Sequence, residues 1–244
     1  NCPANPGAWK LHGVFHKKVR KELKKREDNG ETLQLARAAA EEQARVAAET
    51  GDEYQELQAE AARHAVKEDW RRAARSLREA IALRPDQPLA CFNLGAMLCN
   101  SVHYVEAAQR YLEAKERFPV GSEFWARATS KAFDMLNLQA CDEVAKPEWW
   151  NDEELKALSA WVVRAAPNHV EAISMRATVL SGRAVAETGV SQIYRMWGLG
   201  PRSAAELKEA ATHFDRAAAQ KRAPAGKADI ALMAVACRTQ ADAM

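Results

Sequence analysis

Residues 70–119 read WRRAARSLREAIALRPDQPLACFNLGAMLCNSVHYVEAAQRYLEAKERFP, and one pattern occurs twice within this stretch. The second copy follows 34 residues after the first (104 − 70), with residues of similar size or polarity at matching positions: Trp70 and Tyr104, Ala73 and Ala107, Leu77 and Tyr111, Ala80 and Ala114, and Pro85 and Pro119. A fixed period of this length is typical of stacked helix–turn–helix units. The repetition therefore predicts how the protein is built, but it does not identify a partner.

The composition favours an all-α fold. The 244-residue sequence is 48% hydrophobic, and much of that fraction is alanine, the best helix former. Within the repeat, the 3–4–3 spacing of Trp70, Ala73, Leu77 and Ala80 places these residues on one face of a helix. No alternating apolar run of the kind that forms strands stands out.

The second copy of the pattern resembles the tetratricopeptide repeat. The resemblance is carried by Leu94, Gly95, Tyr104, Ala107, Tyr111, Ala114 and Pro119. Cys91 stands where the family has its first aromatic residue, and the preceding unit matches in its second half only, with Glu60 and Ala61 in place of Leu-Gly. The resemblance implies a curved, right-handed array of antiparallel helical hairpins, a solenoid with a C-terminal capping helix.

Further units complete a predicted helical-repeat domain over residues 31–244. We expect units at about 54–87, 88–121, 122–167 and 170–224, an insertion at 182–203 inside the last unit, and a capping helix at 227–243. Pro147 interrupts the third unit, and Asn151 is expected to cap the helix that follows. The alanine-rich helix at 31–50 is either the second helix of a degenerate earlier repeat or an end cap.

Residues 1–30 form a basic arm that prolines and glycines make partly irregular, with a helix expected at 14–28. Its charge of +5 leaves −3 for the remainder (2 − 5), so the body has no basic surface of the size that nucleic acids require. The arm is either a solvated helix face or an electrostatic contact for RNA, an acidic partner or a membrane surface. Its main cations are Lys17, Lys18, Arg20, Lys21, Lys24, Lys25 and Arg26.

The cysteines predict an intracellular, soluble protein with reduced thiols, because their odd number shows no tight pairing. They are Cys2, Cys91, Cys99, Cys141 and Cys237. No apolar run is long enough for a membrane span. The first residue is Asn, so we expect a processed product or a piece of a longer protein.

Motifs of catalysis and cofactor binding are absent from the sequence. It contains no glycine-rich phosphate loop, HExxH, GxSxG or CxxC. His12 and His16, with Cys2 nearby, supply too few ligands for a metal site. We therefore expect a non-enzymatic protein with no metal and no cofactor.

The family resemblance implies a concave groove, lined by the first helix of each unit, that binds an extended peptide or a partner's helix. Its predicted contact residues are Gln55, Gln58, Phe92, Asn93, Ala96, Asn100, Arg127, Ser130, Asp134 and Ser174. Asn93 can hydrogen-bond a peptide backbone at both ends of its amide, and Arg127 can bind a carboxylate through two nitrogens. Glu123 would repel a carboxylate and argues against the clamp with which chaperone-binding members hold a peptide terminus.

Aromatic residues where the period breaks are candidate secondary contacts: Trp149, Trp150, Tyr194 and Trp197. Each pair packs either on the array or on a partner. The leading hypothesis is a protein-interaction scaffold. The alternatives are a structural subunit of a larger assembly and an RNA-binding helical-repeat protein that uses the basic arm.

Overall fold

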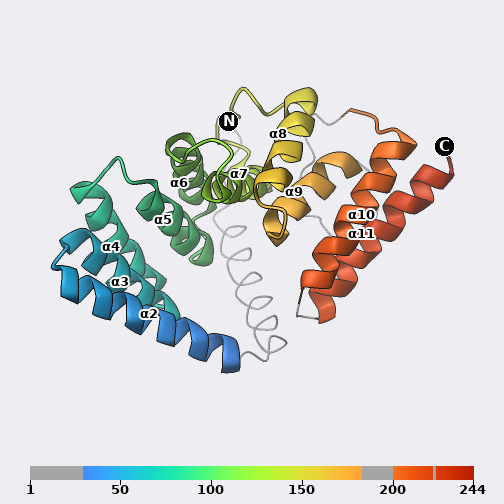
Figure 1. Ribbon diagram of the computed structural model, residues 1–244. Coiled ribbons are helices and arrows are strands. Elements are labelled where there is room, and N and C mark those ends of the chain that lie inside the picture. Colours follow the sequence, from blue (N-terminus) through green and yellow to red (C-terminus); the bar gives the residue numbers. More distant parts are fainter. Residues whose placement is uncertain (1–29, 183–199, 222–223) are drawn as a thin grey trace, which may run out of the picture.

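The all-α prediction is confirmed by the computed structural model, which describes residues 30–182, 200–221 and 224–244 and contains no strand in these ranges (Figure 1). The elements are α2 (Gly30–Thr50), α3 (Glu53–Val66), α4 (Trp70–Leu83), α5 (Pro88–Asn100), α6 (Tyr104–Arg117), α7 (Glu123–Leu136), the 3-10 turn η1 (Gln139–Cys141), α8 (Asp152–Ala165), α9 (Val170–Ser181), α10 (Ala204–Gln220) and α11 (Pro224–Asp242). The basic arm lies outside the described residues.

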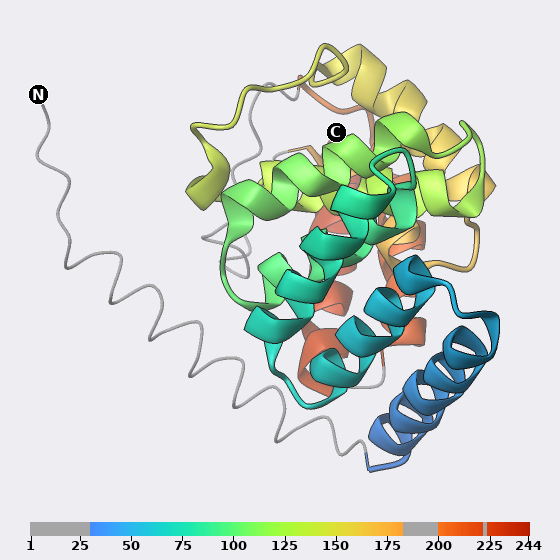
Figure 2. The ribbon, with the colours of Figure 1, turned by 90° about the vertical axis from the view of Figure 1, so that its left-hand side faces the viewer.

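Each α-helix packs against the next one in the chain, from α2 on α3 to α10 on α11. The helices follow one another along an arch, from α2 at the left of Figure 1 to α11 at the right. Figure 2 looks along this arch from the α2 end, with α2 at the lower right. α7 contacts α9 as well as α8, so the helices before α8 and those after it pack directly against each other.

The 34-residue period corresponds to equivalent helices. α4 and α6 have 14 residues each and begin 34 positions apart, at Trp70 and Tyr104. The repeated alanines are buried, as are Leu77 and Tyr111, whereas Trp70 and Tyr104 are half-buried. Gly95 on α5 faces the Tyr111 ring. A Cβ atom at Gly95 would lie 2.9 Å from a ring carbon of Tyr111. The glycine therefore allows α5 to approach α6 closely.

The irregular segment before α8 packs on the array through Trp150. Its ring lies 5.4 Å from that of Phe133 on α7, and the Lys146 ammonium lies 5.0 Å from the Trp150 ring centroid. The same ammonium donates a 2.6 Å hydrogen bond to the carbonyl of Leu136 and so satisfies an acceptor at the end of α7. Asn151 caps α8, because its Oδ1 accepts the backbone N–H of Glu154 at 3.0 Å.

A buried arginine fixes the junction between α8, α9 and α10. The guanidinium of Arg202 donates to both Asp152 oxygens, at 2.6 and 3.1 Å, and to the Val179 carbonyl at 2.8 Å. Ser203 and Glu206 then form a capping box that starts α10. α9 ends at Ser181 and α10 begins at Ala204, and residues 183–199 of the predicted insertion lie outside the described residues.

Two further observations concern thiols and membranes. None of the four described cysteines forms a disulfide. Cys91, Cys141 and Cys237 are buried, and Cys99 is half-buried. Across the described ranges, no helix combines the length and the apolar character that a bilayer crossing requires.

Candidate partner-binding groove

A groove of about 870 Å³ lies between α2, α3 and the start of α5. Gln55, Gln58 and Asn93, three of the predicted contact residues, line it. Most of the remaining lining is apolar and small, with Ala36, Ala39, Ala40, Ala59, Ala61, Ala62 and Ala65 beside Val46, Val66, Leu77, Leu89 and Met97. Because alanine fills little space, the groove has room for larger side chains of a ligand.

An amide pair spans the polar part of this groove. The Nδ2 of Asn93 donates a 3.2 Å hydrogen bond to the Oε1 of Gln58, which joins α5 to α3. This bond leaves the Asn93 carbonyl oxygen as an acceptor and the Gln58 NH₂ as a donor. A peptide backbone needs one donor and one acceptor per residue, so the pair can bind a ligand without rearranging.

The wall formed by α2 was not predicted from the sequence. Ala36, Ala39, Gln43 and Val46 line the groove opposite α3 and α5. The sequence signal is the thin apolar stripe of the 31–50 helix, which shows that the helix packs on something. It does not show on which helix, because that depends on how the chain turns at Gly51, where φ is +62°.

Arg127 on α7 lies between two aromatic rings and is not among the residues that line the groove. Its guanidinium carbon is 5.4 Å from the ring centroids of both Phe92 and Phe124. Phe124 is 43% exposed and stacks on Phe118 at 5.4 Å. No ion pair of Arg127 is found among the described residues, and its guanidinium contacts the two rings instead.

Carboxylates gather beside Arg127, where α7 faces α9. Lys131 binds Glu171 at 3.1 Å, and the His169 ring lies 2.9 Å from Glu123 and 3.6 Å from Glu171. Burial by itself would raise the pKa of Glu171, but the bond from Lys131 and the contact with His169 lower that pKa to about 2. Glu171 is therefore a satisfied carboxylate.

Asp134 is the exception among these carboxylates. It is half-buried and, within the described part of the chain, accepts no hydrogen bond and forms no ion pair. Burial raises its pKa to about 6, and Glu171 adds to the rise, while Lys131 and Lys221 oppose it. The difference from Glu171 has a geometric cause, because the Lys131 ammonium is bonded to Glu171.

Two predicted contact residues are placed differently by the structure. Ser130 is fully buried and donates to the carbonyl of Ala126 at 2.9 Å, so its side chain does not line the groove. Phe92 is only 7% exposed and packs edge-on against Tyr111, so it belongs to the core and reaches a ligand through Arg127 alone. The sequence pattern of α5 and α7 did not show which side of each helix packs against the neighbouring helices, so it did not predict that Phe92 and Ser130 are buried.

The other predicted residues are at least partly accessible. Ala96, Asn100 and Ser174 are half-buried, and Gln55 is exposed. Trp149 and Trp150 are half-buried and contact each other, with the Lys115 ammonium 5.6 Å from the Trp149 ring centroid. Their packing partners thus include residues of this chain. Tyr194 and Trp197 lie outside the described residues.

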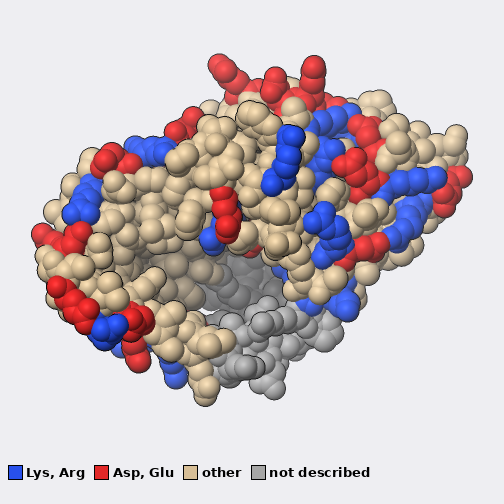
Figure 3. All heavy atoms as spheres, in the orientation of Figure 1, with Lys and Arg blue, Asp and Glu red and all other residues tan. Residues whose placement is uncertain are grey.

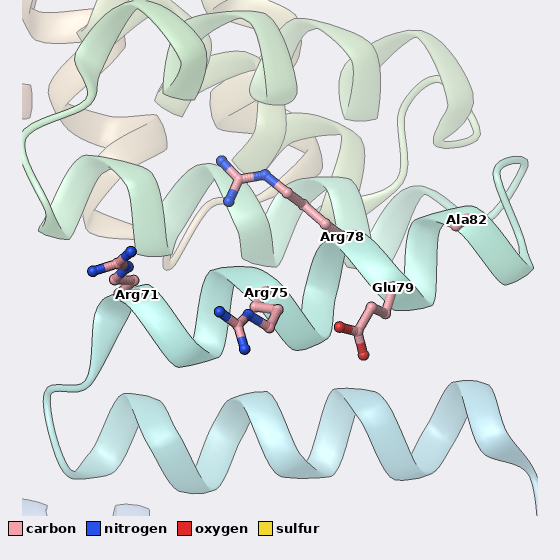
Figure 4. Close-up of a pocket in the computed structure, with 5 residues that line it drawn as sticks. All are labelled: Arg71, Arg75, Arg78, Glu79 and Ala82. Carbon is pink, nitrogen blue, oxygen red and sulfur yellow. The ribbon is translucent and has the colours of Figure 1, made fainter.

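A smaller hollow of about 460 Å³ lies on the surface of α4 (Figure 4). Its lining residues, Arg71, Arg75, Arg78, Glu79 and Ala82, all belong to that one helix. Arg78 points toward the neighbouring helices in Figure 4 and pairs with Glu106 at 2.9 Å. This hollow is a gap between side chains on one helix, whereas the groove is enclosed by several helices.

Charged side chains are unevenly spread on the face of the described residues that Figure 3 shows. Basic and acidic side chains intermingle over the α8–α11 end in Figure 3, while the area over α5 and α6 is largely uncharged. The described residues include no group of three or more side chains placed to bind a metal ion. Comparison of the sequence with models of known protein families and with curated proteins finds no match. The tetratricopeptide resemblance therefore remains a prediction from the residues.

Proposed function

We propose that this chain is a tetratricopeptide-like scaffold, an array of helical hairpins whose groove binds an extended peptide or a helix of a protein partner without catalysis. The hairpin units are α3 with α4 and α5 with α6, and the 34-residue offset between Trp70 and Tyr104 supports them. The partner segment lies against α3 and α5 and continues toward Arg127 on α7.

The groove between α2, α3 and α5 carries this proposal. It combines about 870 Å³ of space, alanine walls and an amide pair with a free donor and a free acceptor. Binding sites commonly pair an apolar lining with a few convergent polar groups. A groove of amides and alanines suits the backbone of a peptide better than it suits a phosphate or a small charged metabolite.

Selection from a phage-displayed library of random 12-residue peptides tests the proposal. Peptides retained by the wild-type protein would be measured by fluorescence anisotropy against Ala62→Phe, which fills the groove from α3. Ala82→Phe is the matched control, because Ala82 is exposed on α4 and lies outside the groove. Circular dichroism would establish that both variants keep their helical content.

We expect Ala62→Phe to weaken peptide binding at least about tenfold and Ala82→Phe to leave it within about twofold, since a ring in the groove occupies the ligand's space. Enrichment of no peptide, or equal binding by both variants, would contradict groove binding.

A second candidate, a structural subunit of a larger assembly, is favoured by exposed apolar residues on the two end helices. Leu35 on α2 is 65% exposed, and Leu232 and Val235 on α11 are 47% and 53% exposed. Such residues are common next to a partner chain. Size-exclusion chromatography with light scattering on native source material separates the two candidates, because a free monomer would contradict a permanent subunit.

A further inference from the structure

The outer face of α11 carries an uncharged stripe that no part of the described structure covers. α11 packs on α10 through Ala234, Cys237 and Ala241, which are buried on one face of the helix. On the opposite face, steps of three or four residues align a second set of side chains, all of them exposed: Ala228, Leu232, Val235, Thr239 and Ala243. α11 therefore has two faces suited to helix packing, and α10 occupies only one of them.

The opposite end of the arch has a different outer face (Figure 1). On α2, the face turned away from α3 follows a similar spacing but holds two glutamates and an arginine: Leu35, Ala38, Glu42, Arg45 and Glu49. Arg45 pairs with both glutamates at 2.6 Å. Such a polar face suits the solvent-exposed end of a helical array. It does not suit the α11 stripe, because a head-to-tail contact would bury these charges against apolar side chains.

The α11 stripe is complementary to itself when two copies run antiparallel. A two-fold axis midway between residues 233 and 234 is equally distant from Leu232 and Val235, and equally distant from Ala228 and Thr239. Leu232 of each copy then lies opposite Val235 of the other, and the smaller residues flank this centre. The small flanking side chains allow the two helices to approach closely.

The charged residues of α11 do not oppose this pairing. Arg238 and Asp242 each form an ion pair with a residue of α10. Asp229 is exposed at one edge of the stripe, where an antiparallel second copy presents its Ala236. No like charges meet across the contact, and no ion pair of the described structure has to be broken to form it.

We propose that this protein forms a two-fold dimer in which α11 packs antiparallel on the α11 of a second copy, with Leu232 of each chain against Val235 of the other. A two-fold dimer uses the same surface on both copies and is the commonest homo-oligomer. The stripe is about 23 Å long and forms a smaller contact than the roughly 800 Å² per partner of stable complexes, so we expect a dissociation constant in the micromolar range.

The dimer would leave both partner-binding grooves accessible. The groove lies at the α2 end of the arch and α11 at the other end, so the two grooves would lie away from the contact between the copies. A partner with two binding segments could then engage both grooves at once. The dimer itself does not depend on what the groove binds.

Sedimentation velocity of the full chain at about 1 to 300 μM measures this association. Leu232→Glu and Val235→Lys each place a charge against an apolar residue of the second copy. Leu35→Glu is the matched control, because Leu35 is an exposed leucine on the outer face of α2. An equimolar mixture of Leu232→Glu and Val235→Lys tests the register, since the two new charges face each other in the mixed dimer. Circular dichroism would establish that all variants keep their helical content.

We expect wild type and Leu35→Glu to dimerise with dissociation constants within about twofold of each other, and each α11 variant alone to dimerise at least about tenfold more weakly. The mixture should associate at least about tenfold more tightly than either variant alone. Wild-type protein that stays monomeric over this range, or a dimer that Leu232→Glu leaves intact, would overturn the inference. A mixture that associates no better than its components would overturn the antiparallel register.

Discussion

Replacing Asp134 by asparagine is predicted to stabilise the folded protein at neutral pH. Asparagine keeps the shape of the side chain and removes a charge that the folded state holds unfavourably. The pKa of Asp134 rises from 3.8 to about 6, a difference of about 2 pH units. Each unit corresponds to about 1.4 kcal/mol, so the upper limit is about 3 kcal/mol, and partial exposure reduces the expected gain to about 1–2 kcal/mol.

The pH dependence follows from the direction of the shift. Because the folded state binds this proton more tightly than the unfolded state, stability contributed by Asp134 is present below pH 4 and is lost as the pH rises to about 6. Glu171 has the opposite dependence, since its pKa is lowered to about 2. When the free energy of unfolding of Asp134→Asn is compared with that of wild type, the contribution of Glu171 cancels, to the extent that the substitution leaves the pKa of Glu171 unchanged. The remaining difference is the contribution of Asp134.

Urea unfolding of wild type, Asp134→Asn and Asp229→Asn, followed by circular dichroism at pH 4.5 and 7.5, measures this difference. We expect the free energy of unfolding of Asp134→Asn to exceed that of wild type by about 1 kcal/mol or more at pH 7.5, and by much less at pH 4.5. A variant that is equally stable, or less stable, at pH 7.5 would show that Asp134 is satisfied in the folded state.

Other predictions concern contacts that hold the arch together. Arg202→Ala should lower the free energy of unfolding by about 3 kcal/mol, because the Val179 carbonyl and Asp152 lose a buried partner. In the same urea titration, Arg72→Ala removes an exposed ion pair and should change the free energy of unfolding by less than about 0.5 kcal/mol. Equal effects of the two substitutions would show that the buried pair contributes no more than the exposed one. Gly95→Ala should cost about 1–3 kcal/mol, because the added methyl would overlap the buried Tyr111 ring. A Tyr111→Leu background should remove much of that cost, and full additivity of the two changes would refute the overlap.

Local patterns in the sequence were enough to place most helices. The 3–4–3 spacing from Trp70 to Ala80 predicts α4, and Asn151 predicts the start of α8, because helix periodicity and capping depend on residues within a turn or two. α9 ends at Ser181 and α10 begins at Ala204, but residues 183–199 lie outside the described residues, so the expected insertion at 182–203 stays a prediction. Gln55, Gln58 and Asn93 line the groove between α2, α3 and α5, and their contact with a partner stays a prediction.

What the sequence by itself determined was therefore the helical class and the positions of individual helices such as α4 and α8, which follow from spacings of a few residues. The tertiary structure decided the α2 wall of the groove, the burial of Ser130, the pairing of Arg202 with Asp152 and the unsatisfied state of Asp134. These features depend on helices that lie far apart in the sequence and meet only when the chain folds. Desolvation and ion pairing are properties of that packed environment, and no local pattern encodes them.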